Sequence, residues 1–296
     1  TLSSSSAASD VYKRQSLTSP TSIISADQNR NLLGELRRRH PSWYYWTIAY
    51  AVLTVICLAA GLIDERNFQG VSVWDKPFKF ALSIAVYFAT LGWFANLMQP
   101  NYFNTLRGKL LTGVPVVCAL LEMLYILVQG ARGEPSHFNV SSPFYSVMYG
   151  LMGAGAALMV ATCLWMGCSI LRNRGANDIW VLSVGIGLIG TFVLGGGFGF
   201  YLGGAEAHWI SGETTDAGGL PLVNWSRSGG DLRVAHFFGI HAMQVIPCVG
   251  ALLVWLRQRN RIGHLSAQVC LTSVSLGFAA FCIGTFIQAL RGVPFI

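Results

Sequence analysis

Charged residues are scarce in this sequence: Asp, Glu, Lys and Arg make up only 11% of its 296 residues, whereas hydrophobic residues make up 53%. A soluble domain usually carries about 25% charged residues. The chain therefore lacks the polar surface that a water-soluble protein needs, and lipid is its natural solvent. Its net charge of +7 is spread over short segments between apolar runs. This pattern is typical of membrane topology and argues against a nucleic-acid partner.

Cysteine pairs of the kind that bind zinc are also absent. All seven cysteines fall inside apolar stretches, and none forms a Cys-x-x-Cys motif. Free cysteine is among the most buried residue types. We therefore expect small core residues rather than disulfides or zinc ligands.

The beginning of the chain lacks apolar periodicity. Residues 1–15 resemble a translated sequencing adapter, so we exclude them from the fold as non-native sequence. We expect residues 1–40 to be a disordered N-terminal segment and residues 41–296 to form one transmembrane domain.

Seven segments have the roughly 20 apolar residues that a helix needs to cross the hydrocarbon layer. Helices are favoured because every backbone polar group must be satisfied within lipid. We predict an all-α fold, an integral membrane bundle of seven transmembrane helices. The segments are approximately 43–62, 78–98, 109–131, 144–171, 179–202, 232–256 and 268–290.

Lysine and arginine predict the orientation of the bundle. Eleven of them flank the segments on one side and seven on the other, and most acidic residues lie on the second side. Because positive residues stay in the cytoplasm, we expect a cytoplasmic N-terminus, an extracytoplasmic C-terminus and a long outer loop over residues 203–230. The last segment has no lysine, which excludes a retinal-binding rhodopsin.

Two patterns concern helix packing. Gly195, Gly199 and Gly203 are spaced by four within the fifth segment, and small residues at this spacing let two helices approach closely in lipid. The third and seventh segments both end in Gln-x-x-Arg-Gly-x-Pro, starting at Gln129 and Gln288. This match indicates either a parallel repeat with an offset of four helices or simply a convenient interfacial helix stop.

Polar residues gather toward the outer side of three segments. Ionisable groups within a membrane are costly and tend to mark function. The polar residues are Glu122, Tyr125, Gln129 and Arg132 on the third segment, Arg233, His236, His241 and Gln244 on the sixth, and Gln288 and Arg291 on the seventh. Glu122 and His241 both lie about 13.5 Å deep at 1.5 Å per residue. We therefore predict that they pair in one buried polar network.

Four histidines lie in the outer half, His137, His208, His236 and His241. Neutral imidazole is a common ligand of haem iron and other metals. His236 and His241 are five residues apart, which is wrong for chelating one metal from one regular helix. Any haem or metal site would combine one of them with His137 or His208. The alternative is that these histidines are hydrogen-bonded structural residues.

Three segments carry a family resemblance: residues 74–83 (WDKPFKFALS), 136–139 (SHFN) and 229–241 (GGDLRVAHFFGIH). They resemble an uncharacterised family of bacterial multi-pass membrane proteins. The resemblance implies a bacterial plasma membrane, but it transfers no activity, cofactor or catalytic residue.

Three functions remain open for a membrane protein with a polar pocket that opens to its outer face. The first is a redox role in which the pocket holds haem or quinone. The second is a proton-coupled or other transporter of a small solute that enters from the outer side. The third is a sensor or assembly factor in which the polar network only fixes helix register.

Overall fold

The computed structural model describes residues 31–205 and 207–296. Its long helices are α4 (Pro41–Ile63), α5 (Asp75–Phe94), α6 (Leu106–Arg132), α7 (Pro143–Arg174), α11 (Ala242–Gln258) and α12 (His264–Leu290). Its shorter helices are α3 (Leu32–Arg39), α8 (Ile179–Gly190), α9 (Gly197–Gly204) and α10 (Arg233–Ile240). Single turns form η1 (Ala95–Leu97), η2 (Tyr102–Asn104) and the π-helical η3 (Thr191–Gly196). The strands are β1 (Asn67–Phe68), β2 (Val71–Ser72), β3 (Trp209–Ile210) and β4 (Gly230–Asp231), and they form the antiparallel pairs β1–β2 and β3–β4.

Six helical segments of the described chain are long and apolar enough to cross a membrane, since α8, η3 and α9 run on as one. The pair α10–α11, bent by 45°, would add a seventh crossing. Many large apolar side chains on these helices are exposed; Leu62 is 82% and Phe200 89% accessible. Soluble proteins rarely expose so much apolar surface. The helical membrane fold predicted from the sequence is therefore present.

Polar caps define where the helices begin. Thr105 and Ser142 accept backbone N–H bonds at the starts of α6 and α7, and Asp178 does so for α8. Pro143 follows its cap at the first helical position, where a missing N–H costs nothing.

The prediction that residues 1–40 are disordered is wrong for the last residues of that segment. Leu32–Arg39 form α3, which Asn31 caps and which buries Leu36. The other residues of that segment, 1–30, lie outside the described chain. The sequence gives no apolar stripe here because α3 has one buried residue and three consecutive arginines.

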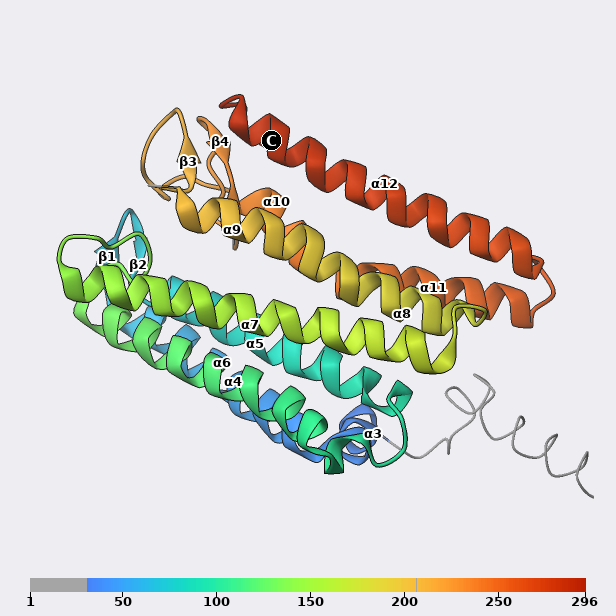
Figure 1. Cartoon of the computed structure of the whole chain (residues 1–296). Coiled ribbons are helices and arrows are strands. Elements are labelled where there is room, and N and C mark those ends of the chain that lie inside the picture. Colours follow the sequence, from blue (N-terminus) through green and yellow to red (C-terminus); the bar gives the residue numbers. More distant parts are fainter. Residues whose placement is uncertain (1–30, 206) are drawn as a thin grey trace, which may run out of the picture.

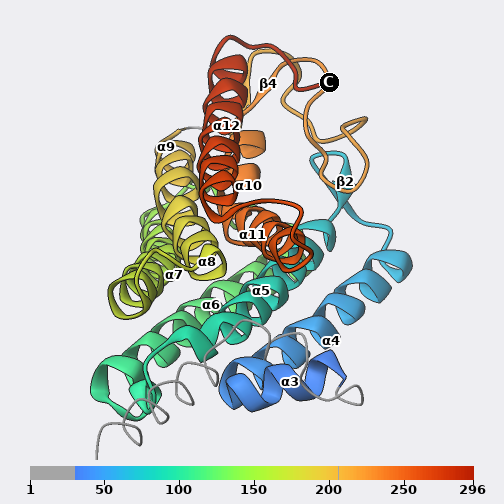
Figure 2. The same cartoon turned by 90° about the vertical axis from the view of Figure 1, so that its right-hand side faces the viewer.

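The helices form two groups of three, which we call the triplets. Triplet one consists of α4, α5 and α6. Triplet two consists of the continuous α8–η3–α9 segment, the bent α10–α11 pair and α12. Figures 1 and 2 show the triplets as two groups, with α7 packed against both α6 and α8. All four strands lie at one end of the helices, which we call the hairpin end, and α3 lies at the other, the basic end (Figure 1).

The two triplets share local structure. In each, the first and second helices make the most extensive contact, and the third packs more on the second than on the first. Both third helices end in the same turn: Gln129 Nε2 donates to the Pro135 carbonyl at 3.1 Å, and Gln288 Nε2 donates to the Pro294 carbonyl at 2.6 Å. The intervening glycines have φ values of 70° and 72°. The matched turn is expected of a repeat and of a simple helix stop alike, whereas the shared order of helix contacts is a feature that a repeat would add.

Candidate functional site

The bend between α10 and α11 is held by a side chain from the neighbouring π-helical turn. Thr191 Oγ1 donates to the Ile240 carbonyl at 3.2 Å and accepts the Met243 N–H at 3.0 Å. These backbone groups flank His241, where the helix is interrupted. In lipid, broken helices persist only where such groups find partners. Thr191 therefore stabilises a bent helix pair, and helix irregularities of this kind often lie at functional sites.

The glycine stripe provides the surface on which His236 rests. His236 Nδ1 contacts the Gly195 carbonyl at 2.9 Å. A Cβ at Gly199 would lie 2.8 Å from His236 Cε1, and one at Gly195 would lie 2.8 Å from the Ile240 nitrogen. A Cβ at Gly203 would meet nothing within 4 Å. The expected close packing thus holds for Gly195 and Gly199 but not for Gly203. The absence of a side chain at Gly199 makes room for the His236 imidazole.

A cluster of charged groups occupies the hairpin end of triplet two. We call it the outer charge cluster; it consists of His208, Asp216, Asp231 and Arg233. The Arg233 guanidinium lies 2.7 Å from Asp231 Oδ2 and 2.8 Å from Asp216 Oδ1. His208 lies beside both carboxylates, at 3.8 Å from Asp231 and 4.0 Å from Asp216. Asp231 is buried, with 1% of its surface exposed.

Electrostatics fix the charge states of this cluster. Burial opposes ionisation of Asp231, but the hydrogen bond and charge of Arg233 outweigh it and lower the pKa of Asp231. Burial, followed by the positive charge of Arg233, lowers the pKa of His208 to about 3, against the opposing influence of Asp231. His208 is therefore neutral near neutral pH, between an arginine and two carboxylates.

A second cluster brings ionisable groups of both triplets within electrostatic range of one another. We call it the inner polar cluster; it consists of Lys76 of α5, Glu122 of α6, His137 of the α6–α7 loop and His236 of α10. Burial lowers the pKa of His137 well below its usual value, and the nearby Lys76 and His236 lower it further. Lys76 also has Glu122 as a charged neighbour. Both triplets therefore contribute ionisable groups to one region.

Aromatic rings flank two members of the inner polar cluster, His137 and Lys76. The His137 ring lies 5.4 Å from Phe80 and 6.0 Å from Tyr149, and Lys76 Nζ lies 5.9 Å from the Phe80 ring centre. Among the described residues, Lys76 Nζ has no ion-pair or hydrogen-bond partner within contact distance, and neither ring Nε2 of His137 or His236 is bonded. Lys76, His137 and His236 are half-buried. The cluster thus offers one amine and two imidazole rings with free hydrogen-bonding capacity.

The predicted pair of Glu122 and His241 is not formed. His241 Nδ1 instead contacts Gln244 Oε1 at 3.2 Å, and Gln244 Nε2 donates to Thr90 of α5 at 3.0 Å. α6 packs on α7 and α5 rather than on α10 or α11. The prediction failed because matched depth does not fix lateral position. The charged neighbour of Glu122 is Lys76.

The remaining predicted residues do not converge on this region. Arg132 forms an exposed ion pair with Glu134 at 2.9 Å, and Arg291 is exposed at the end of α12. Tyr125 is buried, and its hydroxyl has no partner. Gln129 and Gln288 close the matched turns. The sequence analysis did not include Lys76 or Asp216 among the candidate site residues. It counted both only among the charged residues that predict the membrane orientation, although Lys76 lies just before an apolar span.

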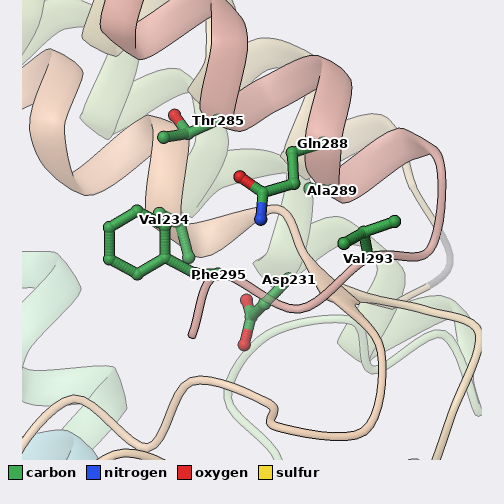
Figure 3. Close-up of a pocket in the computed structure, with 7 residues that line it drawn as sticks. All are labelled: Asp231, Val234, Thr285, Gln288, Ala289, Val293 and Phe295. Atoms are coloured by element: carbon green, nitrogen blue, oxygen red, sulfur yellow. The ribbon is translucent and has the colours of Figure 1, made fainter.

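A small pocket lies beside the outer charge cluster, between the end of α12 and the C-terminal residues (Figure 3). Its empty space, open solvent included, is only about 140 Å³. Its lining includes Asp231, Thr285, Gln288 and Phe295. Ligand pockets usually measure about 300–1,000 Å³. Arg233 and the Ser226 N–H already donate hydrogen bonds to Asp231. The pocket is therefore too small for a typical ligand, and its carboxylate already has partners, so we do not take it as the main site.

No group of three or more His, Cys, Asp or Glu side chains in the described chain could hold a metal ion. Comparisons with models of protein families, with curated proteins and with solved structures return no match. The chemistry of the inner polar cluster is therefore the basis for a functional proposal.

Proposed function

We propose that this protein is a transporter of a small organic anion in a bacterial plasma membrane. The observation that carries the proposal is the inner polar cluster, where the unpaired ammonium of Lys76 lies near two neutral histidines. A carboxylate could accept hydrogen bonds from Lys76 Nζ and from His137 Nε2–H, in the tautomer whose Nδ1 accepts from the Ser136 hydroxyl. His236 uses its ring N–H on the Gly195 carbonyl, so its Nε2 would accept a hydrogen bond from a solute hydroxyl or amine. Aromatic rings, including Phe80 and Tyr149, would contact the apolar part of the solute.

The surrounding architecture supports transport over a purely structural role. Ionisable residues inside membranes commonly mark solute or ion pathways. In many transporters the solute binds between internal repeats, beside a discontinuous helix. The inner polar cluster matches both features: it draws its residues from both triplets, and His236 belongs to the bent α10–α11 pair.

The proposal includes seven crossings with the N-terminus in the cytoplasm. Basic residues flank the helices mainly at the basic end, and α10–α11 is long enough to count as one bent span. The solute would then enter from the outside through the hairpin end. Reporter fusions after residue 140 should report an extracytoplasmic location, and fusions after residue 174 a cytoplasmic one. The reverse pattern contradicts the orientation.

Anion binding can be tested with purified protein and a panel of benzoate, acetate and sulfate. A ligand that binds only the folded protein raises its melting temperature. Benzoate should raise the melting temperature of the wild type and of Lys79→Met, but not of Lys76→Met. Lys79 is the matched control because its ammonium is already paired with Asp75 at 2.7 Å. A wild type that responds to none of the three anions contradicts the proposal.

Haem binding is the second candidate, favoured by the bond between His236 Nδ1 and the Gly195 carbonyl. A histidine that ligates a metal usually bonds its other ring nitrogen in this way, which leaves Nε2 for iron. Visible absorption by the purified protein distinguishes the two candidates. A haem spectrum that disappears in His236→Ala and His137→Ala would favour the redox function.

A further inference from the structure

Two segments at the basic end carry exposed leucines beside exposed cations. Leu32, at the start of α3, is 74% exposed, and Leu106, at the start of α6, is 73% exposed. Exposed cations follow a short way along each helix. We call the whole set the basic-end surface, and it consists of Leu32, Leu33 and Arg37 of α3 and Leu106, Arg107 and Lys109 of α6. Each segment thus combines an apolar part with a positive part.

The connection between α3 and α4 holds the two segments together. His40 is the only residue between these helices. Its Nε2 lies 3.3 Å from Thr112 Oγ1 of α6, and its ring centre lies 4.5 Å from that of Phe103, which precedes α6 in η2. Figure 1 shows α3 and the start of α6 at the same end of the helices. The basic-end surface is therefore one region of the molecule, built from two elements.

The fold itself makes little use of the cations on this surface. Arg39, a neighbouring cation, has an almost fully buried side chain and donates to the Trp93 carbonyl at 2.6 Å. Among the described residues, Arg37, Arg107 and Lys109 instead form no ion pair or hydrogen bond within contact distance. Positive charge in the first turn of α6 also opposes the helix macrodipole. These cations therefore fit an anion from outside the chain.

We propose that the basic-end surface binds anionic phospholipid, with its cations on the headgroup phosphates and its leucines in the adjoining acyl chains. Helices that lie in the membrane interface combine these two kinds of side chain, and Lys and Arg beside a membrane span attract anionic lipid. A soluble anion would satisfy the cations but leave Leu32 and Leu106 in water. A phospholipid supplies both partners in one molecule. The inference does not depend on the proposed transport of a solute.

Membrane insertion also uses positive residues at one end of a bundle. That role is complete once the helices have crossed the bilayer, whereas lipid binding continues in the folded protein. Measurements on purified, folded protein therefore separate the two roles. They also avoid any assumption about which side of the membrane the basic end occupies.

Thermal unfolding in a neutral detergent tests the proposal with added dioleoylphosphatidylglycerol, which is anionic, or dioleoylphosphatidylcholine, which is zwitterionic and has the same chains. A lipid that binds only the folded protein raises its melting temperature. The wild type should respond to phosphatidylglycerol at much lower concentrations than to phosphatidylcholine. Arg37→Gln/Arg107→Gln should weaken the phosphatidylglycerol response by about 25-fold in concentration, at about fivefold for each cation removed.

Arg227→Gln/Arg291→Gln is the matched control, because it removes two exposed cations at the hairpin end. It should retain the wild-type response to phosphatidylglycerol. Leu32→Gln tests the apolar part and should weaken the response to phosphatidylglycerol while all the cations remain. Inorganic phosphate at the same concentrations should produce no shift in the wild type, because it offers the leucines no partner.

Three outcomes overturn the proposal. The first is an equal response of the wild type to the two lipids, which decides the question even if a variant does not fold. The second is an equal loss in Arg37→Gln/Arg107→Gln and in Arg227→Gln/Arg291→Gln, which would assign the effect to net charge alone. The third is a shift by inorganic phosphate that matches the shift by phosphatidylglycerol, which would identify a site for a soluble anion.

Discussion

At the scale of single residues, the outer charge cluster shows why burial determines the value of an ion pair. Asp231 has no exposed side-chain surface and Arg233 has 23%, whereas Arg132 and Glu134 have 54% and 36%. Removing one partner of a buried pair leaves an uncompensated charge, which costs about 3–5 kcal/mol. An exposed pair contributes about 0–1 kcal/mol.

Asp231→Ala should therefore lower the free energy of unfolding by about 3 kcal/mol, the lower end of that range because Arg233 is partly exposed. Glu134→Ala is the matched control and should leave it close to the wild-type value, because an exposed pair contributes little. Thermal unfolding in one detergent compares the two. Equal losses would mean that the cluster does not stabilise the fold.

His208 should make the stability depend on pH. Its folded pKa of about 3 lies below the value of about 6.5 for an unperturbed histidine. Between these values the unfolded chain binds the proton and the folded chain does not, so stability falls as pH falls. The loss from pH 7 to pH 5 should be about 2 kcal/mol for this histidine.

Unfolding measured over this pH range should show a smaller loss in His208→Gln than in the wild type. His264, exposed at the start of α12, provides the control, and His264→Gln should retain the wild-type slope. An unchanged slope in His208→Gln would contradict the assignment of a buried neutral imidazole.

At the scale of elements, apolar length predicted the crossings well. The expected segments 144–171 and 179–202 lie within α7 (Pro143–Arg174) and within the segment from Ile179 to Gly204. The π-turn η3 and the bend at His241 could not be predicted, because both depend on tertiary contacts. The hydroxyl that holds the bend, Thr191, comes from a different span. Matched depth alone gave the wrong partner for Glu122, because α6 does not pack on α10 or α11.

Thr191→Val should weaken the bend between α10 and α11. The substitution keeps the shape but removes the group that pairs with the Ile240 carbonyl and the Met243 N–H, and an unsatisfied buried polar group costs about 1–3 kcal/mol. Thr191→Ser should restore most of the stability. Thr54→Val is the control, because the Thr54 hydroxyl bonds only to a carbonyl of its own helix. Equal melting temperatures of Thr191→Val and Thr54→Val would exclude this role.

At the scale of the whole molecule, the sequence located the polar end but not its division into two clusters. His208, Arg233 and His236 were recognised from their types and positions near the outer ends of spans. Lys76 and Asp216 come from an unrelated helix start and a long loop, so only the three-dimensional arrangement joins them to the histidines. A linear pattern cannot contain that information.

The triplets are joined across the hairpin end by loop contacts that we call the clasp. Gln69 and Asp75 belong to triplet one, and they bond to residues of the long loop of triplet two. The Asp216 N–H and the Thr215 hydroxyl donate to the Gln69 carbonyl at 2.9 and 3.0 Å, and Asn224 Nδ2 donates to Asp75 Oδ2 at 2.9 Å. Because the clasp lies at the proposed entrance, its strength should govern solute exchange.

Asn224→Asp tests the clasp with almost no change in shape. Asn224 has φ of 56°, which both Asn and Asp tolerate, but the new carboxylate would face Asp75 and replace a donor with a like charge. Benzoate release should become faster, and amide hydrogen exchange over residues 207–231 should increase. Asn173→Asp is the control at the basic end, because Asn173 Oδ1 accepts a hydrogen bond from Gln99 and Asp keeps that acceptor. Faster exchange in the loop with unchanged benzoate release would show that the clasp is structural and that solute enters by another route.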